Sequence, residues 1–219
     1  MIKILLLAVG LLTAGSTLAA NLVTNGGFEN TAGFVDNGQN TMSLGAGSTT
    51  MTGWTVINDT IAWIGDPNPF GPSANEGVRF LDLTDYSTGA PFGGVRQTIV
   101  TQIGAVYDIS FDVGAFGGTS RVQFTAGSFI APLASASSTS GSSWTTFNSS
   151  FTATGLTTTI DLLGMAASAN GNYIGLDNVV VTLNHVANPV PEPETYAMML
   201  AGLGLLGFVA RRRKQKAVV

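Results

Sequence analysis

Hydrophobic and polar residues alternate in short segments along the middle of the chain. In residues 107–113, aromatic and aliphatic side chains occupy the odd positions, and Asp or Ser occupies the even ones. A period of two predicts a β-strand with one face in a core and the other in water. Similar apolar segments, separated by residues typical of turns, are 54–57, 61–64, 78–83, 95–100, 121–125, 144–152, 158–163 and 174–183. No segment shows a helical period.

Nine strands without intervening helices predict an all-β domain, an antiparallel β-sandwich or jelly roll, over residues 21–185. The chain shows no internal repeat, which argues against a propeller or solenoid. Polar, Gly-rich residues 30–52 are expected to form a long loop. Gly117-Gly118 is expected to form a turn, and Ser135 to Ser143 a surface loop.

The last predicted strand changes its inward face in the middle. Ile174 and Leu176 share one parity, whereas Val179 and Val181 share the other. One extra residue at Asp177-Asn178 would restore the alternation, so the pattern predicts a β-bulge that redirects a carboxylate.

The first twenty residues have the composition of a secretory signal peptide, which would form a helix. Lys3 precedes the apolar run 4–12, and small residues follow at 17–20. We expect export through the Sec translocon and cleavage after Ala19 or Ala20. A retained N-terminal anchor is the alternative, but nine apolar residues are too few to span a bilayer.

The C-terminal end has three parts: a Pro-rich linker at 186–195, an uncharged apolar stretch at 196–210 and a basic tail at 211–219. As a helix, the apolar stretch would reach roughly 22 Å, short for a hydrocarbon core of about 30 Å. We predict a transmembrane helix that relies on bilayer thinning or on its polar flanks. The positive-inside rule places the basic tail in the cytoplasm and the sandwich across the membrane.

These C-terminal residues resemble the PEP-CTERM sorting signal of Gram-negative bacteria. The motif Pro191, Glu192, Pro193, the glycines of 202–207 and the cluster Arg211, Arg212, Arg213 occur in the order typical of that signal. The resemblance implies that an exosortase, a membrane peptidase, cuts at or near Pro-Glu-Pro and delivers the protein to the cell surface or the extracellular polymer. An ordinary C-terminal anchor would give the same topology without cleavage.

Charge and cysteine content narrow the classes of partner. Between residues 20 and 190, three arginines face eleven Asp and Glu, which gives this segment a formal charge of −8. Such a surface repels nucleic acids and anionic headgroups and suits neutral sugars or calcium. The chain has no cysteine, so thiol chemistry is excluded and the fold must be stable without disulfides.

A second resemblance covers about 160 residues and is carried by 21–29, Trp54, 95–112, 144–151 and 174–181. These segments resemble the galactose-binding-like β-sandwich of carbohydrate-binding modules. In that family a first-strand Glu and a last-strand Asp often hold a structural calcium ion, and the matching residues are Glu29 and Asp177. Alternatively, Glu29 closes a turn and Asp177 accepts backbone amides, each without an ion.

Sugar rings bind to aromatic platforms surrounded by amides or carboxylates. Gly and Pro surround several aromatic residues, which favours exposure in loops. The candidate glycan contacts are Trp63, Phe70, Tyr86 and Phe92.

The sequence gives little support to catalysis. His185 is the single histidine and lies beside the linker, so nucleophilic triads and His-based metal sites are excluded. Loop carboxylates at 59, 66, 76, 82 and 85 leave glycoside hydrolysis open, although each is expected to be a turn or solvated residue. We therefore expect that the protein is not an enzyme and has no catalytic residues. The first hypothesis is a module that binds extracellular polysaccharide; the second is a matrix or surface-layer component without a discrete ligand; the third is a weak glycan hydrolase.

Overall fold

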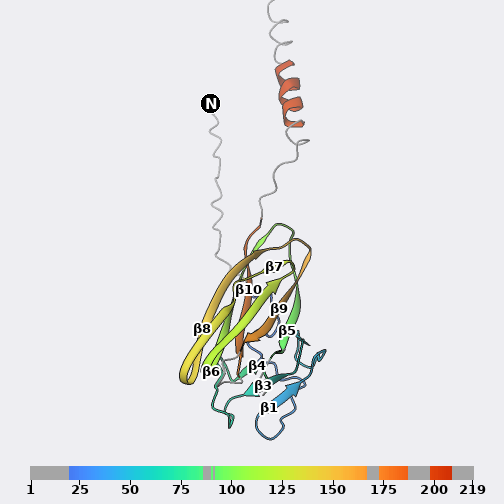
Figure 1. The fold of residues 1–219 in the computed structure, drawn as a ribbon. Helices are drawn as coiled ribbons and strands as arrows, with labels where there is room; N and C mark the ends of the chain where they lie inside the picture. The colour runs from blue at the N-terminus through green and yellow to red at the C-terminus, as the bar shows by residue number, and fades with distance from the viewer. Residues whose placement is uncertain (1–19, 86–89, 91, 167–172, 187–197, 209–219) are drawn as a thin grey trace, which may run out of the picture. The chain divides into compact units, whose positions relative to one another are not determined.

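Ten β-strands form in the described part of the chain, all of them in the first of two units, 1–186 and 187–219. A computed structural model describes residues 20–85, 90, 92–166, 173–186 and 198–208 (Figure 1). The strands are β1 (Thr41–Leu44), β2 (Thr55–Ile57), β3 (Ile61–Gly65), β4 (Arg79–Asp82), β5 (Gly94–Val100), β6 (Val106–Ala126), β7 (Phe129–Ile130), β8 (Ala134–Thr152), β9 (Thr157–Ala166) and β10 (Gly175–His185).

The strands form two antiparallel sheets that share one long hairpin. Sheet I has the order β1-β3-β4-β10-β6-β8 and uses the first half of β6 and the second half of β8. Sheet II has the order β8-β6-β9-β5-β2 and uses the other halves of β6 and β8. The predicted antiparallel β-sandwich is therefore confirmed.

The two sheets enclose one hydrophobic core. Tyr107, Ile109 and Phe111 of β6 are at most 2% exposed, as their alternation predicted. Phe124, in the half of β6 that belongs to sheet II, packs against Phe151 of sheet I with ring centroids 6.1 Å apart. Core residues extend from Val23 to Val181, so the sandwich carries its whole core within residues 20–186.

Two segments predicted to be a turn and a loop are strand instead. At Gly117 the chain has a positive φ of 65° and the register shifts, so β6 continues from one sheet into the other rather than ending in a turn. The Ser-rich segment 135–143 belongs to β8, which pairs with β6 over both halves. Backbone hydrogen bonds to β6 form whatever the side chains are, so exposed serines gave no apolar alternation to find.

The predicted loop 30–52 is also partly wrong, because β1 lies within it and pairs with β3. The bulge in β10 is confirmed. Asp177 lies opposite Asp112 and Val180 opposite Ser110, so β10 has one more residue than β6 between these pairs. Asn178 takes a positive φ of 51° there.

In the second unit, residues 198–208 are helical and exposed, within the predicted transmembrane stretch 196–210. Among the described residues, no helix combines the length and the apolarity needed to cross a bilayer. Residues 1–19, 187–197 and 209–219 lie outside the described part. The signal peptide helix, the Pro-Glu-Pro motif and the basic tail therefore remain predictions from the sequence.

Candidate functional site

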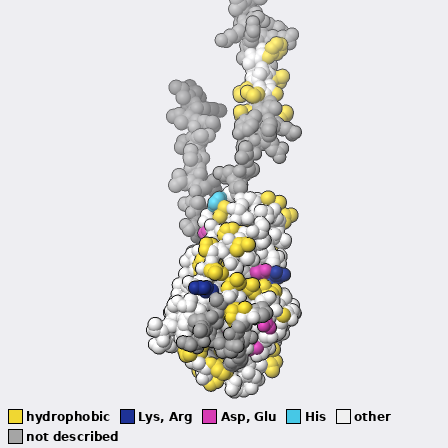
Figure 2. Space-filling view, in the orientation of Figure 1, with side chains coloured by type: hydrophobic (Ala, Val, Ile, Leu, Met, Phe, Trp, Pro, Cys, Tyr) yellow, Lys and Arg dark blue, Asp and Glu magenta, His cyan; other side chains and the backbone are white. Residues whose placement is uncertain are grey.

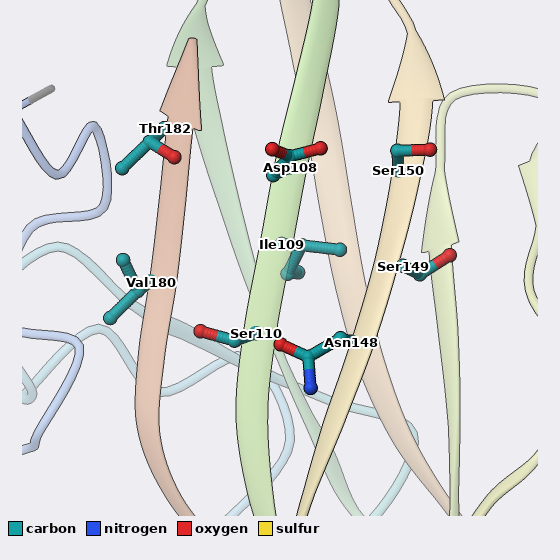
Figure 3. Close-up of a pocket in the computed structure, with 8 residues that line it drawn as sticks. All are labelled: Asp108, Ile109, Ser110, Asn148, Ser149, Ser150, Val180 and Thr182. Atoms are coloured by element: carbon teal, nitrogen blue, oxygen red, sulfur yellow. The ribbon is translucent and has the colours of Figure 1, made fainter. Parts of the chain in front are cut away.

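A groove runs across the outer face of sheet I, with a volume of about 530 Å³. Figure 3 shows its lining on three neighbouring strands, with β6 in the middle. Asp108 of β6 lies opposite Ser150 of β8 and Thr182 of β10, and Ser110 lies opposite Asn148 and Val180. We call this the sheet groove; its lining residues are Asp108, Ile109, Ser110, Asn148, Ser149, Ser150, Val180 and Thr182.

The sheet groove offers hydroxyl and amide groups and one carboxylate. Asp108 Oδ2 accepts a hydrogen bond of 2.7 Å from Asn184 Nδ2, which fixes this carboxylate at the upper rim. Asn148 and Ser150 are exposed, and both project from β8. Because Asp108 is the only carboxylate among the lining residues, the groove lacks the pair that glycoside hydrolysis requires.

Residues 66–78 join β3 to β4 and cross the same sheet face beyond the sheet groove. We call these residues the covering loop. At the β8 side, Ser73 N donates to Ser142 Oγ and Trp144 Nε1 donates to the Ser73 carbonyl. In the middle, Asn75 Nδ2 donates to Asp112 Oδ2 at 2.7 Å. The covering loop thus shields Asp112, which the alternation had predicted to face water.

Asp177 holds the covering loop from β10. Its Oδ2 accepts the backbone amides of Asn75 and Glu76 at 3.0 and 3.1 Å, and its Oδ1 accepts that of Asn178. Burial raises the pKa of Asp177 to about 7, although the three amides oppose this shift. The bulge therefore directs a fully buried carboxylate under the loop, where desolvation favours its protonated form.

Two further polar side chains lie in this covered region. Asp82 accepts hydrogen bonds from Thr84 and from the backbone amide of Ile174, and burial raises its pKa to about 6. The sequence had suggested a solvated loop residue, but Asp82 ends β4 and is buried. Burial also raises the pKa of the Tyr173 hydroxyl, whose oxygen has no hydrogen-bond partner among the described residues.

The structure brings Glu29 and Asp177 to the same covering loop. Glu29 Oε1 accepts the amides of Val78 and Arg79 at 2.8 and 2.7 Å, at the end where the loop enters β4. Both carboxylates therefore accept backbone amides, as expected from the alternative in which neither holds an ion. No group of three or more His, Cys, Asp or Glu among the described residues is placed to hold a metal ion. Calcium binding at these two residues remains an untested prediction.

The aromatic candidates lie mostly away from the surface. The expectation that Trp63 and Phe92 are exposed is wrong, since they are 0% and 6% exposed. Trp63 donates from Nε1 to the Phe28 carbonyl and belongs to the core, because its strand β3 is buried throughout. Phe70 is half-buried in the covering loop, and Tyr86 lies outside the described residues.

Sequence reasoning did not single out Trp144, which lies beside the covering loop. It is half-buried on the outer face of β8, opposite Gly114, and its ring packs edge-on against Phe80 at a centroid distance of 6.0 Å. Trp144, Thr146 and Asn148 are alternate residues of β8 and therefore share one face of the strand. Trp144 thus lies in line with the sheet groove. The parity of β8 was a usable signal: Trp144, Asn148 and Ser150 share one face.

Of the processing residues, only Ala20 is described, and it is exposed. Ala19, the motif Pro191, Glu192, Pro193 and the cluster Arg211, Arg212, Arg213 fall outside the described residues. His185 is exposed at the end of β10 and contacts Asn184.

Two family models match the chain. One, described as protein of unknown function (DUF642), matches residues 21–181, and the other, described as the PEP-CTERM protein-sorting motif, matches residues 189–214. The second match confirms the resemblance of the C-terminal residues to this sorting signal.

Halomucin of Haloquadratum walsbyi (strain DSM 16790 / HBSQ001) is 27% identical over 187 residues. The match covers 82% of this chain and 2% of halomucin, so the chain spans a very small part of that relative.

Carbohydrate-binding modules occur among the similar solved structures. The CBM22-1 xylan-binding domain of Paenibacillus barcinonensis Xyn10C is 18% identical with a TM-score of 0.43, covering 67% of this chain and 95% of that one. A family 35 module from Clostridium thermocellum is 12% identical with a TM-score of 0.41, covering 64% and 97%.

Proposed function

The chain belongs to the DUF642 family, whose description assigns no function, and from its structure we propose that the sandwich binds extracellular polysaccharide in the sheet groove. The observation that carries the proposal is the lining. Three adjacent strands present hydroxyl, amide and carboxylate groups in one open depression. Sugar hydroxyls both donate and accept hydrogen bonds, so they complement such groups.

The charge of the groove selects among polysaccharides. Asp108 is its one charged lining residue, and the sandwich as a whole is acidic. The acidic sandwich would repel an anionic polymer, whereas the hydroxyls of a neutral polymer can donate hydrogen bonds to Asp108. Trp144, in line with the groove, supplies a ring face on which a sugar can stack.

The sorting motif indicates export and delivery to the cell surface. We further propose Sec-dependent export with removal of residues 1–20, a transient single-pass anchor formed by residues 196–210, and exosortase cleavage near Pro191. The exopolysaccharide outside the cell would then be the polymer that meets the groove. These steps follow from the order of the sequence segments.

We propose binding without catalysis. The groove has a single lining carboxylate, and His185 lies exposed beside Asn184 rather than next to a nucleophile. A matrix component without a discrete ligand is the second candidate, favoured by the hydroxyl-rich surface of β8. A weak hydrolase is the third, and turnover of polymeric sugar substrates would reveal it.

A glycan array followed by affinity electrophoresis in neutral polysaccharides tests the proposal on the sandwich, residues 20–186. We expect Asn148→Ala and Asp108→Ala each to weaken retardation about tenfold, or roughly 1.4 kcal/mol. The matched control is Thr98→Ala, on the outer face of β5 in sheet II. No binding on the array, or equal binding by all three variants, would remove the groove as the site.

The mass of the intact protein recovered from envelope and medium tests the sorting route. We expect a species that begins near residue 20 and ends near Pro191. A C-terminus at Val219 in the outer fraction would contradict cleavage.

A further inference from the structure

Strand β8 forms the free edge of both sheets. Within the described residues it pairs with β6 alone, whereas the opposite edges are the four-residue β1 and the three-residue β2. β8 is 19 residues long, and Figure 1 shows it along one side of the sandwich. In an antiparallel pair, every second residue of an edge strand directs its N–H and C=O away from its neighbour, so β8 presents a long row of such groups.

Strand β8 lacks the charged and Pro residues that usually protect an edge strand, although it carries a bulge at residues 139–141, opposite Gly117 of β6. Proteins block long edges with charged side chains, especially Lys, or with Pro. Residues 134–152 contain no Asp, Glu, Lys, Arg or Pro, and most of the side chains are Ser, Thr or Ala. This absence distinguishes β8 from β5 and β9, which lie inside sheet II and nevertheless carry Arg96 and Asp161.

The inward face of sheet I is also left incomplete at this edge. Phe147 packs on Phe111 with ring centroids 5.1 Å apart, yet it remains half-buried, and Thr145 beside it is exposed. Both point toward the core side, so another strand beside β8 would cover them.

We propose that the second half of β8, Ser142–Thr152, pairs antiparallel with the same strand of a second copy of this chain. Such a pair is two-fold symmetric and closes on itself, so each copy uses the same surface. Ser and Thr side chains facing each other across the new pair can exchange hydrogen bonds. The contact joins the two copies of sheet I into one continuous sheet.

Charge explains why the partner is another copy. Two acidic sandwiches repel each other unless they meet on a surface without carboxylates, and β8 is such a surface. The nearest carboxylates of sheet I, Asp108 and Asp112, lie on β6, opposite Ser150 and Thr146. Across the interface, two β6 strands are three strand spacings apart, about 14 Å, which exceeds the Debye length of about 8 Å in physiological salt. Figure 2 shows how sparse charged side chains are on one face of the molecule.

Sedimentation equilibrium of the sandwich, residues 20–186, without any glycan, tests the proposal independently of polysaccharide binding. We expect a dimer at concentrations of about 100 µM. Thr145→Glu adds a carboxylate to each edge and should raise the dissociation constant at least about tenfold. The control Thr98→Glu, exposed on an inner strand of sheet II, should leave it unchanged.

A wild-type sandwich that stays monomeric up to about 1 mM would overturn the proposal. So would an equal effect of both substitutions, or none from Thr145→Glu. Circular dichroism checks the folding of each variant. Because the chain has no cysteine, a spin label on one introduced cysteine gives a second measurement that does not depend on added charge. Single spin labels at Thr145→Cys should lie within about 20 Å of each other in the dimer, and labels at Thr98→Cys beyond that. The reverse order of distances would place the interface elsewhere.

Discussion

The outer face of sheet I is open in one half and covered in the other, although the same strands, β6 and β10, build both. In the open half, Asp108 and Ser110 line a groove that water reaches. In the covered half, Asp112 and Asp177, one step further along, are 1% and 0% exposed beneath the covering loop. Strand β6 carries an outward carboxylate in both halves, Asp108 in the open one and Asp112 in the covered one, so the residue type does not account for the difference in their burial.

The covering loop accounts for it. Its backbone amides at Asn75 and Glu76 donate to Asp177, and the Asn75 side chain donates to Asp112. Glu29 accepts the amide of Val78 at the end of the loop and that of Arg79 at the start of β4. Carboxylates that would otherwise face water thereby become internal hydrogen-bond acceptors. The same residue type thus lines an open groove in one half and anchors the covering loop in the other.

The largest expected effect is the loss of the anchor. Asp177→Ala removes the acceptor of three backbone amides and leaves a small cavity. We therefore expect the free energy of unfolding to fall by about 4 kcal/mol at pH 5. Asp177→Asn keeps one acceptor oxygen and should cost less than half as much. Urea unfolding followed by tryptophan fluorescence measures both. A loss below about 1 kcal/mol in the alanine variant would show that the loop holds without this carboxylate.

The second effect is a pH dependence confined to the covered half. The pKa values of Asp82 and Asp177 in the folded protein, about 6 and about 7, lie above the ordinary value of 3.8. The folded protein therefore binds more protons than the unfolded chain, and this contribution to stability is complete below about pH 4 and declines as the pH rises to 7.

The raised pKa of Asp82, about 6, lies in the same range, so the difference between wild type and Asp177→Asn isolates the effect of Asp177. We expect wild type to lose about 2 kcal/mol more than this variant between pH 4 and pH 8. A wild-type stability that rises relative to the variant would show that the amides keep Asp177 ionised.

In the open half, equivalent truncations should be nearly silent. Asn148→Ala, Ser150→Ala and Thr182→Ala each remove groups that contact water, so we expect the unfolding free energy to change by less than about 0.5 kcal/mol. The same urea titration at pH 7 gives the values. A cost above about 1 kcal/mol would mean that the groove side chains support the fold, and the contrast between the halves would fail.

The smallest expected effect concerns calcium. Because Asp177 and Glu29 Oε1 already accept backbone amides, we expect a chelator to shift the melting temperature by less than about 1 °C. Thermal unfolding with EDTA, and then with excess calcium, measures this shift. A fall of several degrees, restored by calcium, would establish an ion at these carboxylates.

The strand pattern identified most of the sandwich, because side chains such as Ile109 and Phe111 alternate wherever one face meets a core. The pattern failed in segments that form a strand without burying one face in the core. The serines of β8 pair with β6 without burying an apolar face, and Gly117 bends β6 into the second sheet without an apolar signal. The bulge at Asp177 was predictable because the two flanking runs differ in parity.

The sites were harder to predict than the strands. Trp63 is surrounded in sequence by Gly and Pro, yet it belongs to the core because β3 lies inside sheet I between β1 and β4. The sheet groove joins residues from β6, β8 and β10, which are separated by up to about seventy positions, and no local motif marks their meeting.

The sequence by itself determined the fold class, the bulge and the sorting signal. These features depend on local alternation, parity and the order of short motifs, all of which can be read along one chain. The tertiary structure decided which polar residues stay wet, which carboxylates hold the covering loop and which strand remains at the edge. Those properties depend on contacts between distant segments, because burial and charge at one residue are set by whatever the fold places above it.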